Sequence, residues 1–153
     1  MPALIFPSKV RDEVLAQHAD LRELLRATVD ELSRQAAAGE SDCARLRVMG
    51  RELCARFHEH LLYEDEELVP VLAVLDTWGP ERVRELHDEH ARQRRTLGAL
   101  WMTFDFATDL GQLGAALRDL AEDMLRDMEA EEAGCLAAEA MAAPLLQVER
   151  LRY

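Results

Sequence analysis

The stretch His60-Leu-Leu-Tyr-Glu64-Asp-Glu-Glu-Leu-Val-Pro70 lies in the middle of a long helical pattern, where apolar side chains should fill a core. The apolar stripe carries an imidazole at His60 and, four residues later, a carboxylate at Glu64. Residues four apart share one face of a helix, with their Cβ atoms about 5–6 Å apart. A metal ion is the commonest reason to bring such a pair to one buried point. The stretch therefore predicts a metal site inside a helical core, with further ligands from other helices.

Length and composition favour one soluble helical domain. The chain has 153 residues, of which 49% are hydrophobic and 5% aromatic, and helix-forming residue types dominate. Thirty acidic residues against 18 basic ones give a formal net charge of -12. This balance argues against a nucleic-acid or anionic-membrane surface, because both need a positive patch. It suits cation binding, although most of these charges simply form a solvated exterior.

The cysteines and the N-terminus bear on localisation. The three cysteines, Cys43, Cys54 and Cys135, are odd in number and show no CxxC spacing, so neither a disulfide framework nor a zinc ribbon is expected. A reducing cytoplasm is the prediction. The N-terminus lacks the pattern of a signal peptide, and no window approaches 18 uncharged apolar residues.

Apolar residues at spacings of three and four define four amphipathic segments and no strand. Pro70 lies inside the second segment and is expected to bend it or to end its regular part. Four such segments with short connections predict an all-α, up-down-up-down four-helix bundle over residues 9–142, with a lead-in at 1–8 and a tail at 143–153. The predicted helices run from Lys9 to Ala38, Cys43 to Leu75, Pro80 to Phe106 and Leu110 to Ala142.

Helical angles indicate which histidines face the core. At about 100° per residue, His60 lies on the apolar stripe, whereas His58 falls about 160° away on the wet side. His18 shares its face with the apolar residues of the first segment, and His90 lies close to the centre of the third stripe. His87 lies about 80° from that centre and is kept as an outer or reserve ligand.

The fourth segment offers acidic candidates. Glu131 lies about 40° to one side of its stripe and Glu132 about 60° to the other, so either carboxylate can turn inward. Asp127, one turn before Glu131, lies nearer the edge.

A simpler interpretation competes with a metal site: a single histidine on an apolar face is usually a core residue that is hydrogen-bonded to a neighbour. Three inward histidines from three helices, together with Glu64, are harder to explain in that way. Buried groups without partners cost about 1–3 kcal/mol each, so a bundle should not keep four of them at one level. A shared metal ion is therefore the preferred interpretation.

These positions resemble the hemerythrin-like (HHE cation-binding) family over about residues 9–142. The resemblance implies a bundle whose core holds a non-haem di-iron centre, with carboxylates bridging the irons and histidines in terminal positions. Members carry or sense O₂, respond to nitric oxide or peroxide, or handle iron. By position, the implied ligands are His18, His60, Glu64 and His90. The motif residues in chain order are His18, His60-x-x-x-Glu64 with Leu68 and Pro70, Glu89-His90, and Glu131-Glu132.

The chain departs from this family where the fourth helix should offer His-x-x-x-Glu. The residue four before Glu131 is Asp127, and the residue four before Glu132 is Met128. Either Asp127 replaces a nitrogen ligand, which would favour oxidation of Fe(II), or one iron is lost. The metal could also be zinc or manganese. Cys135 is expected to pack rather than to ligate.

The leading hypothesis is a cytoplasmic iron-binding protein whose open coordination position binds O₂, NO or peroxide. An apolar shell that includes Phe57 and Trp101 would limit the access of water. One alternative is an enzyme that turns over peroxide, NO or Fe(II) on the same residues. Another is a metal-free bundle that serves as an interaction or regulatory module, which the altered fourth-helix motif favours. Oligomeric state stays open.

Overall fold

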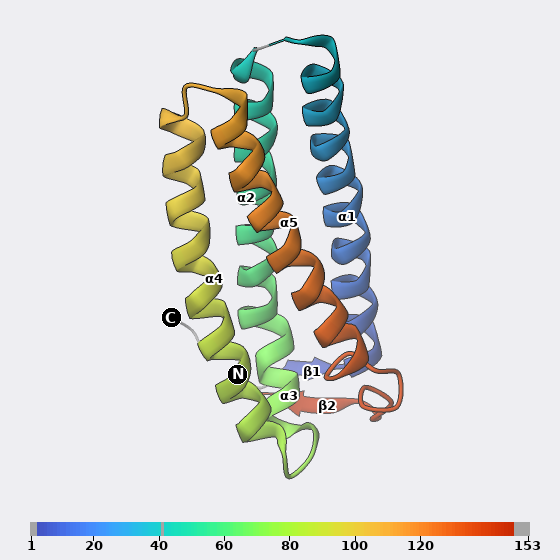
Figure 1. Ribbon diagram of the computed structural model, residues 1–153. Coiled ribbons are helices and arrows are strands. Elements are labelled where there is room, and N and C mark those ends of the chain that lie inside the picture. The colour runs from blue at the N-terminus through green and yellow to red at the C-terminus, as the bar shows by residue number, and fades with distance from the viewer. Residues whose placement is uncertain (1–2, 41, 149–153) are drawn as a thin grey trace.

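Four long helices, packed side by side and alternating in direction, make up most of the structure (Figure 1). The computed structural model describes residues 3–40 and 42–148. The first and third long helices each pack against the second and the fourth, so all four enclose one interior. This arrangement confirms the predicted all-α bundle. The helical elements are α1 (Pro7–Ala38), α2 (Cys43–Tyr63), the π turn η1 (Glu64–Leu68), α3 (Val69–Leu75), α4 (Gly79–Phe106) and α5 (Leu110–Ala133).

The helix ends follow local chemistry. Gly39 ends α1 in the left-handed region, with φ 68°, where a residue without Cβ is favoured. Asp42 accepts a hydrogen bond from the Ala44 N–H at 3.0 Å, which caps the start of α2. Asp109 does the same for α5 by accepting from the Gln112 N–H at 2.9 Å. Within the described residues, none of the helices is both long and apolar enough to span a lipid bilayer.

The last helix is shorter than predicted, because α5 ends at Ala133 rather than at Ala142. The Gly134 N–H and the Leu136 N–H both donate to the carbonyl of Glu131, at 3.1 and 2.9 Å, which closes the helix. The chain then turns so that Leu136 and Met141 become buried. Burial of these two side chains at the end of the bundle outweighs the continued helical pattern.

A small antiparallel sheet closes one end of the bundle, beside α3 in Figure 1. Strand β1 (Ala3–Ile5) pairs with β2 (Leu146–Val148), with Ile5 opposite Leu146. The predictions of a wholly irregular lead-in and of no strand are therefore wrong. Ile5 and Val148 are buried against the bundle, which gives these short strands their stability. Residues 1–2 and 149–153 of the predicted lead-in and tail lie outside the described residues.

A polar layer divides the hydrophobic core in two. One apolar cluster contains Phe57 and Met124, and the other contains Leu68 and Leu136. Trp101, predicted to join the shell of the site, is 41% exposed instead. Seven buried polar residues lie between the two clusters along the helices: His18, His60, Glu64, His90, Gln93, Asp127 and Glu131.

Gly50 allows α2 and α4 to approach closely. A Cβ atom at Gly50 would lie 2.7 Å from the ring of Phe104, which is fully buried. We expect Gly50→Ala to destabilise the protein by about 1–3 kcal/mol through overpacking. Gly98→Ala is the matched control, because its Cβ would meet no described atom within 4 Å. The gain in helix propensity should make that variant up to about 1 kcal/mol more stable in urea unfolding. Equal effects of both variants would contradict this packing.

Candidate metal centre

The second long helix widens at the first candidate carboxylate. In the π turn η1, the Val69 N–H donates to the carbonyl of Glu64, five residues earlier. Pro70 has no N–H, and in a regular α-helix its ring would clash with the carbonyl four residues back. A wider turn removes that conflict, and such turns are frequent at functional sites. The expected disturbance at Pro70 thus takes the form of a π turn, with Glu64 and Leu68 both buried.

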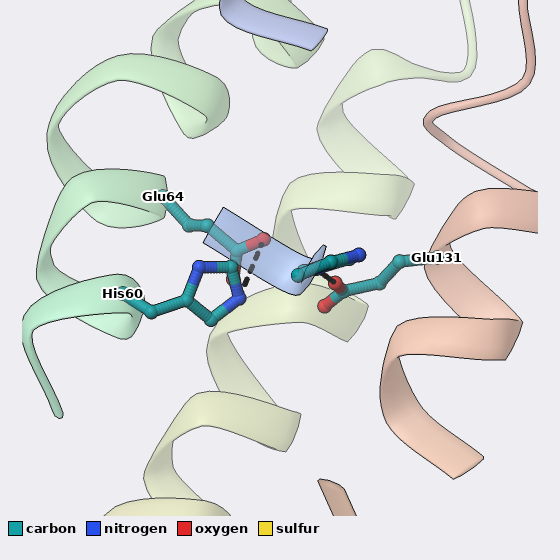
Figure 2. A group of neighbouring side chains, drawn as sticks. His60, Glu64 and Glu131 are labelled. Carbon is teal, nitrogen blue, oxygen red and sulfur yellow. Dashed lines mark ion pairs between the residues drawn. The ribbon is translucent and has the colours of Figure 1, made fainter. Parts of the chain in front are cut away.

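Four buried side chains from three helices converge on one point. His18 comes from α1, His60 from α2, Glu64 from the start of η1 and Glu131 from α5. Each offers one ligand atom, and these four atoms lie within 4.8 Å of one another. Figure 2 shows His60, Glu64 and Glu131 pointing toward one another across the interior. The four residues therefore surround a space where a single ion would fit.

The inward-facing atoms of these residues lack ordinary partners. Among the described residues, no hydrogen bond is made by His18 Nε2, His60 Nε2, Glu64 Oε1 or either carboxylate oxygen of Glu131. His18 Nε2 lies 3.2 Å from a Glu131 oxygen, but without the alignment of a hydrogen bond. Metal–ligand bonds to nitrogen and oxygen are about 2.0–2.2 Å long. One cation placed among these atoms could satisfy all four groups, so the residues fit a metal.

In each of the three buried histidines, the ring nitrogen Nδ1 has a hydrogen-bond partner outside the site. His18 Nδ1 lies 2.8 Å from Glu132 Oε1, and His60 Nδ1 lies 3.0 Å from Gln17 Oε1. His90 Nδ1 lies 2.7 Å from Asp65 Oδ1. Metal-binding histidines usually donate their second ring N–H in this way, which fixes the ring and turns the other nitrogen to the metal.

His90 lies beside the group of four rather than within it. Its Nε2 lies 3.1 Å from Glu64 Oε2, whereas Glu64 Oε1 faces His60 Nε2 at 3.5 Å. The two oxygens of Glu64 are thus directed at histidines of two different helices. Asp127 is buried nearby and accepts a hydrogen bond from the Gln93 amide. This neighbouring space offers one nitrogen ligand and several carboxylate oxygens.

The other predicted residues have clear positions. Glu131 is the inward carboxylate of α5, whereas Glu132 is half-buried and contacts His18 and Arg22 from outside the site. His87 is exposed on α4 and lies outside the group of four converging residues. The angle of His87 from the stripe is too wide for its ring to turn inward.

Two residues near the altered motif are not among the converging ligands. Met128 is fully buried in the apolar cluster. Cys135 follows the end of α5 as a partly buried free thiol, with Sγ 4.0 Å from the carbonyl of Glu131.

Sequence reasoning missed three buried or half-buried partners of the site. Gln17 and Asp65 each bond to a histidine, and Gln93 donates to Asp127. Asp65 carries a detectable signal, because it follows Glu64 just as Glu132 follows Glu131. Gln17 and Gln93 have no such signal, since a glutamine beside a core stripe is common on any helix.

Burial shifts three carboxyls of the site and the imidazole of His60 toward their uncharged forms. It raises the pKa of Glu64 to about 8 and the pKa values of Glu131 and Asp127 to about 7. Burial, with the nearby charges of His18 and His90, lowers the pKa of His60 to about 3. The imidazole of His60 therefore keeps a free lone pair at neutral pH. The buried carboxyls hold protons that a bound cation would displace.

These shifts make the stability of the metal-free protein pH-dependent. Carboxyls with raised pKa values bind more protons in the folded than in the unfolded chain, so their contribution to stability is lost as pH rises through the folded pKa. The lowered pKa of His60 has the opposite effect on stability, but only at pH values below its ordinary pKa of about 6.5. We expect chelator-treated protein to lose about 1–2 kcal/mol of unfolding free energy between pH 7 and 8.5 in urea titrations. Constant or rising stability over this window would contradict the assigned burial of the three carboxyls.

Comparison with known proteins identifies the family. The model of the hemerythrin HHE cation-binding domain matches residues 9–138. No curated protein and no solved structure gives a significant match. The matched region contains all four converging ligands and nearly all of the helices that carry them. The chain belongs to the hemerythrin HHE cation-binding domain family.

Proposed function

We propose that this protein binds iron in the core of the bundle and uses it to bind or sense O₂, NO or peroxide, or to handle iron. The observation that carries the proposal is the set of buried ligand atoms of His18, His60, Glu64 and Glu131, which find no hydrogen-bond partner among the described residues. Two imidazoles and two carboxylates suit iron, and they also suit zinc or manganese. Iron is favoured by the resemblance of the second-helix motif to iron-binding members of the family.

The geometry around Glu64 supports a second iron position. Its Oε1 faces the group of four, whereas its Oε2 lies 3.1 Å from His90 Nε2. A carboxylate with its oxygens directed at two separate sets of ligands is suited to bridge two ions. The second position would be completed by His90 and the buried Asp127. It would hold its ion more weakly than the first, because it has one nitrogen ligand rather than two.

A cleft gives small molecules a route to the site. It has a volume of about 640 Å³, and its lining includes Leu86 of α4, Asp127 and Glu131 of α5, and Cys135 just beyond the end of α5. Two of these residues are the buried carboxylates of the proposed centre. An exogenous ligand such as O₂, NO or peroxide would therefore approach from the side where α5 supplies carboxylates instead of a histidine.

A catalytic role on the same residues is the second candidate function. Iron supplies redox chemistry when bound, and carboxylate ligands stabilise its ferric form. Asp127 stands where the family pattern has a nitrogen ligand, which favours oxidation of Fe(II) over reversible O₂ binding. The buried carboxyls of Asp127 and Glu131, with pKa values of about 7, can hold or release a proton beside the cleft. Consumption of O₂ or peroxide upon addition of Fe(II) would distinguish this function from reversible binding.

The ligand assignment is tested by two histidines on the same helix. His60 is buried with its Nε2 facing the site, whereas His58 is exposed. We expect His60→Ala to lower the affinity for iron by more than about 100-fold, because a ligand is removed. The variant should therefore retain less iron after dialysis. His58→Ala should bind as much iron as the wild type. An equal loss of iron in both variants, measured by metal analysis, would contradict the ligand assignment. A wild type that contains no iron would leave only a helical interaction module.

A further inference from the structure

Two acidic pairs in the chain link the helices in the same way. In Glu64–Asp65 and in Glu131–Glu132, the first carboxylate faces the interior and the second contacts a histidine on a neighbouring helix. Consecutive residues on a helix point about 100° apart, so one acid can ligate while the next reaches sideways. The pair on η1 reaches His90 on α4, and the pair on α5 reaches His18 on α1.

Each outer carboxylate is also paired with an arginine. Glu132 Oε1 lies 2.8 Å from His18 Nδ1 and accepts from Arg22 Nη1 at 2.7 Å. On the opposite side of the bundle, Asp65 accepts from His90 through Oδ1 and from the guanidinium of Arg94 through Oδ2. Both arginines are about one-third exposed, at 36% and 34%, so each chain of contacts runs from the surface to the core.

The third histidine has a neutral partner. His60 Nδ1 donates to the amide oxygen of Gln17 at 3.0 Å. Gln17 is half-buried and lines the groove between α1 and α2. Among the described residues, Gln17 forms no hydrogen bond with an arginine, so the His60–Gln17 contact resembles the other two in geometry but not in charge.

The partner determines which ring nitrogen is free. A neutral imidazole has one N–H and one lone pair, and a carboxylate can only accept hydrogen bonds. In both His18 and His90 the shorter carboxylate contact is at Nδ1, at 2.8 and 2.7 Å against 3.2 and 3.1 Å at Nε2. The proton is therefore assigned to Nδ1, which leaves the lone pair of Nε2 facing the interior. A hydrogen bond to a charged acceptor is also about twice as strong as a neutral one, and it makes the ring a stronger electron donor.

We propose that Glu132 and Asp65 are positioning residues, which hold His18 and His90 with Nε2 toward the metal and make them stronger ligands than His60, whose partner is the neutral Gln17. This inference rests on the proposed metal binding. It adds that the three histidines are unequal and that the inequality is set by residues which do not touch the metal themselves.

The positioning role is tested first without metal. In metal-free protein at pH 9, ¹⁵N NMR should show Nδ1 protonated and Nε2 bare in His18 and His90. The exposed His58 and His87 should show an exchange average of both forms. In Glu132→Gln only His18 should change, and in Asp65→Asn only His90. Predominant Nε2–H forms in the wild type would overturn the proposal, whether or not the protein binds iron.

The strength of the ligands is tested by anaerobic competition for Fe(II) with a chromogenic chelator. Glu132→Gln and Asp65→Asn should each weaken binding by about 10–100-fold. Asp123→Asn is the matched control, because it removes an arginine-paired carboxylate from α5 that contacts no histidine, and its affinity should stay within about twofold. Gln17→Glu should strengthen binding by about tenfold, because it gives His60 a charged partner. Wild-type affinity in Glu132→Gln and Asp65→Asn, or no gain in affinity in Gln17→Glu, would overturn the inference. A wild type that binds no iron would instead overturn the proposed function.

Discussion

Glu64→Gln should abolish tight iron binding and at the same time make the metal-free protein more stable. The amide keeps the shape of the side chain but loses the negative charge of a carboxylate whose oxygens face His60 and His90. Burial holds the pKa of Glu64 at about 8, so at pH 8 the folded protein bears the cost of ionising a buried carboxyl. We expect iron affinity to fall by more than about 100-fold. We expect the unfolding free energy of the metal-free variant to rise on the order of 3 kcal/mol at pH 8.

The sign of this effect depends on pH in a way that can be measured. A raised carboxyl pKa gives stability below the unfolded value, near 4.5, that is lost as pH rises through the folded value. The gain in Glu64→Gln should therefore be close to its full size at pH 8 and become small near pH 4.5 in urea unfolding of chelator-treated protein. Glu59→Gln, an exposed position on the same helix, should change neither stability nor iron binding. A destabilised Glu64→Gln at pH 8 would mean that the carboxylate is held by contacts of its own rather than kept for a metal.

Iron should raise the thermal stability of the protein by a large amount. A ligand that binds the native state alone contributes about 4 kcal/mol at a free concentration of 1,000 times its Kd. For a domain of this size, each kcal/mol shifts the melting temperature by about 2–4 °C, so saturating Fe(II) should raise it by about 8–16 °C. The stabilisation is expected because one ion would cross-link ligands that come from α1, α2 and α5.

Anaerobic thermal melts with and without Fe(II) measure this shift. His60→Ala is the control, because the variant lacks a ligand and its melting temperature should not respond to iron. A wild type that melts at the same temperature with and without Fe(II) would contradict binding to the folded core.

The helices and most of the site are predictable from periodicity. His60 and Glu64 lie on the apolar stripe of their helix, and the structure places both in the interior. His18 and His90 follow in the same way from the first and third long helices. Such predictions succeed because the direction of a side chain on a helix depends on local geometry alone.

The choice between Glu131 and Glu132 could not be made from the sequence. Both residues flank the apolar stripe of α5, so the helix itself allows either one to turn inward. The decision comes from packing, because Glu132 finds His18 and Arg22 on α1 and is drawn out of the interior. Contacts between residues more than one hundred positions apart leave no trace in helical periodicity.

The ends of the chain escaped prediction for a similar reason. Strands of three residues have no periodic pattern to detect, and the stability of β1 and β2 depends on their pairing and on the buried side chains of Ile5 and Val148. Pro70 signalled a disturbance, but the surrounding packing determines whether a helix bends, ends or widens at a proline.

Metal analysis of untagged protein tests the central claim most directly. After anaerobic loading with Fe(II) and dialysis, the wild type should retain one to two iron ions per chain, and Glu64→Gln should retain almost none. A wild type that emerges free of iron, zinc and manganese would contradict the account, because the buried imidazoles and carboxylates would then have to be explained without a metal.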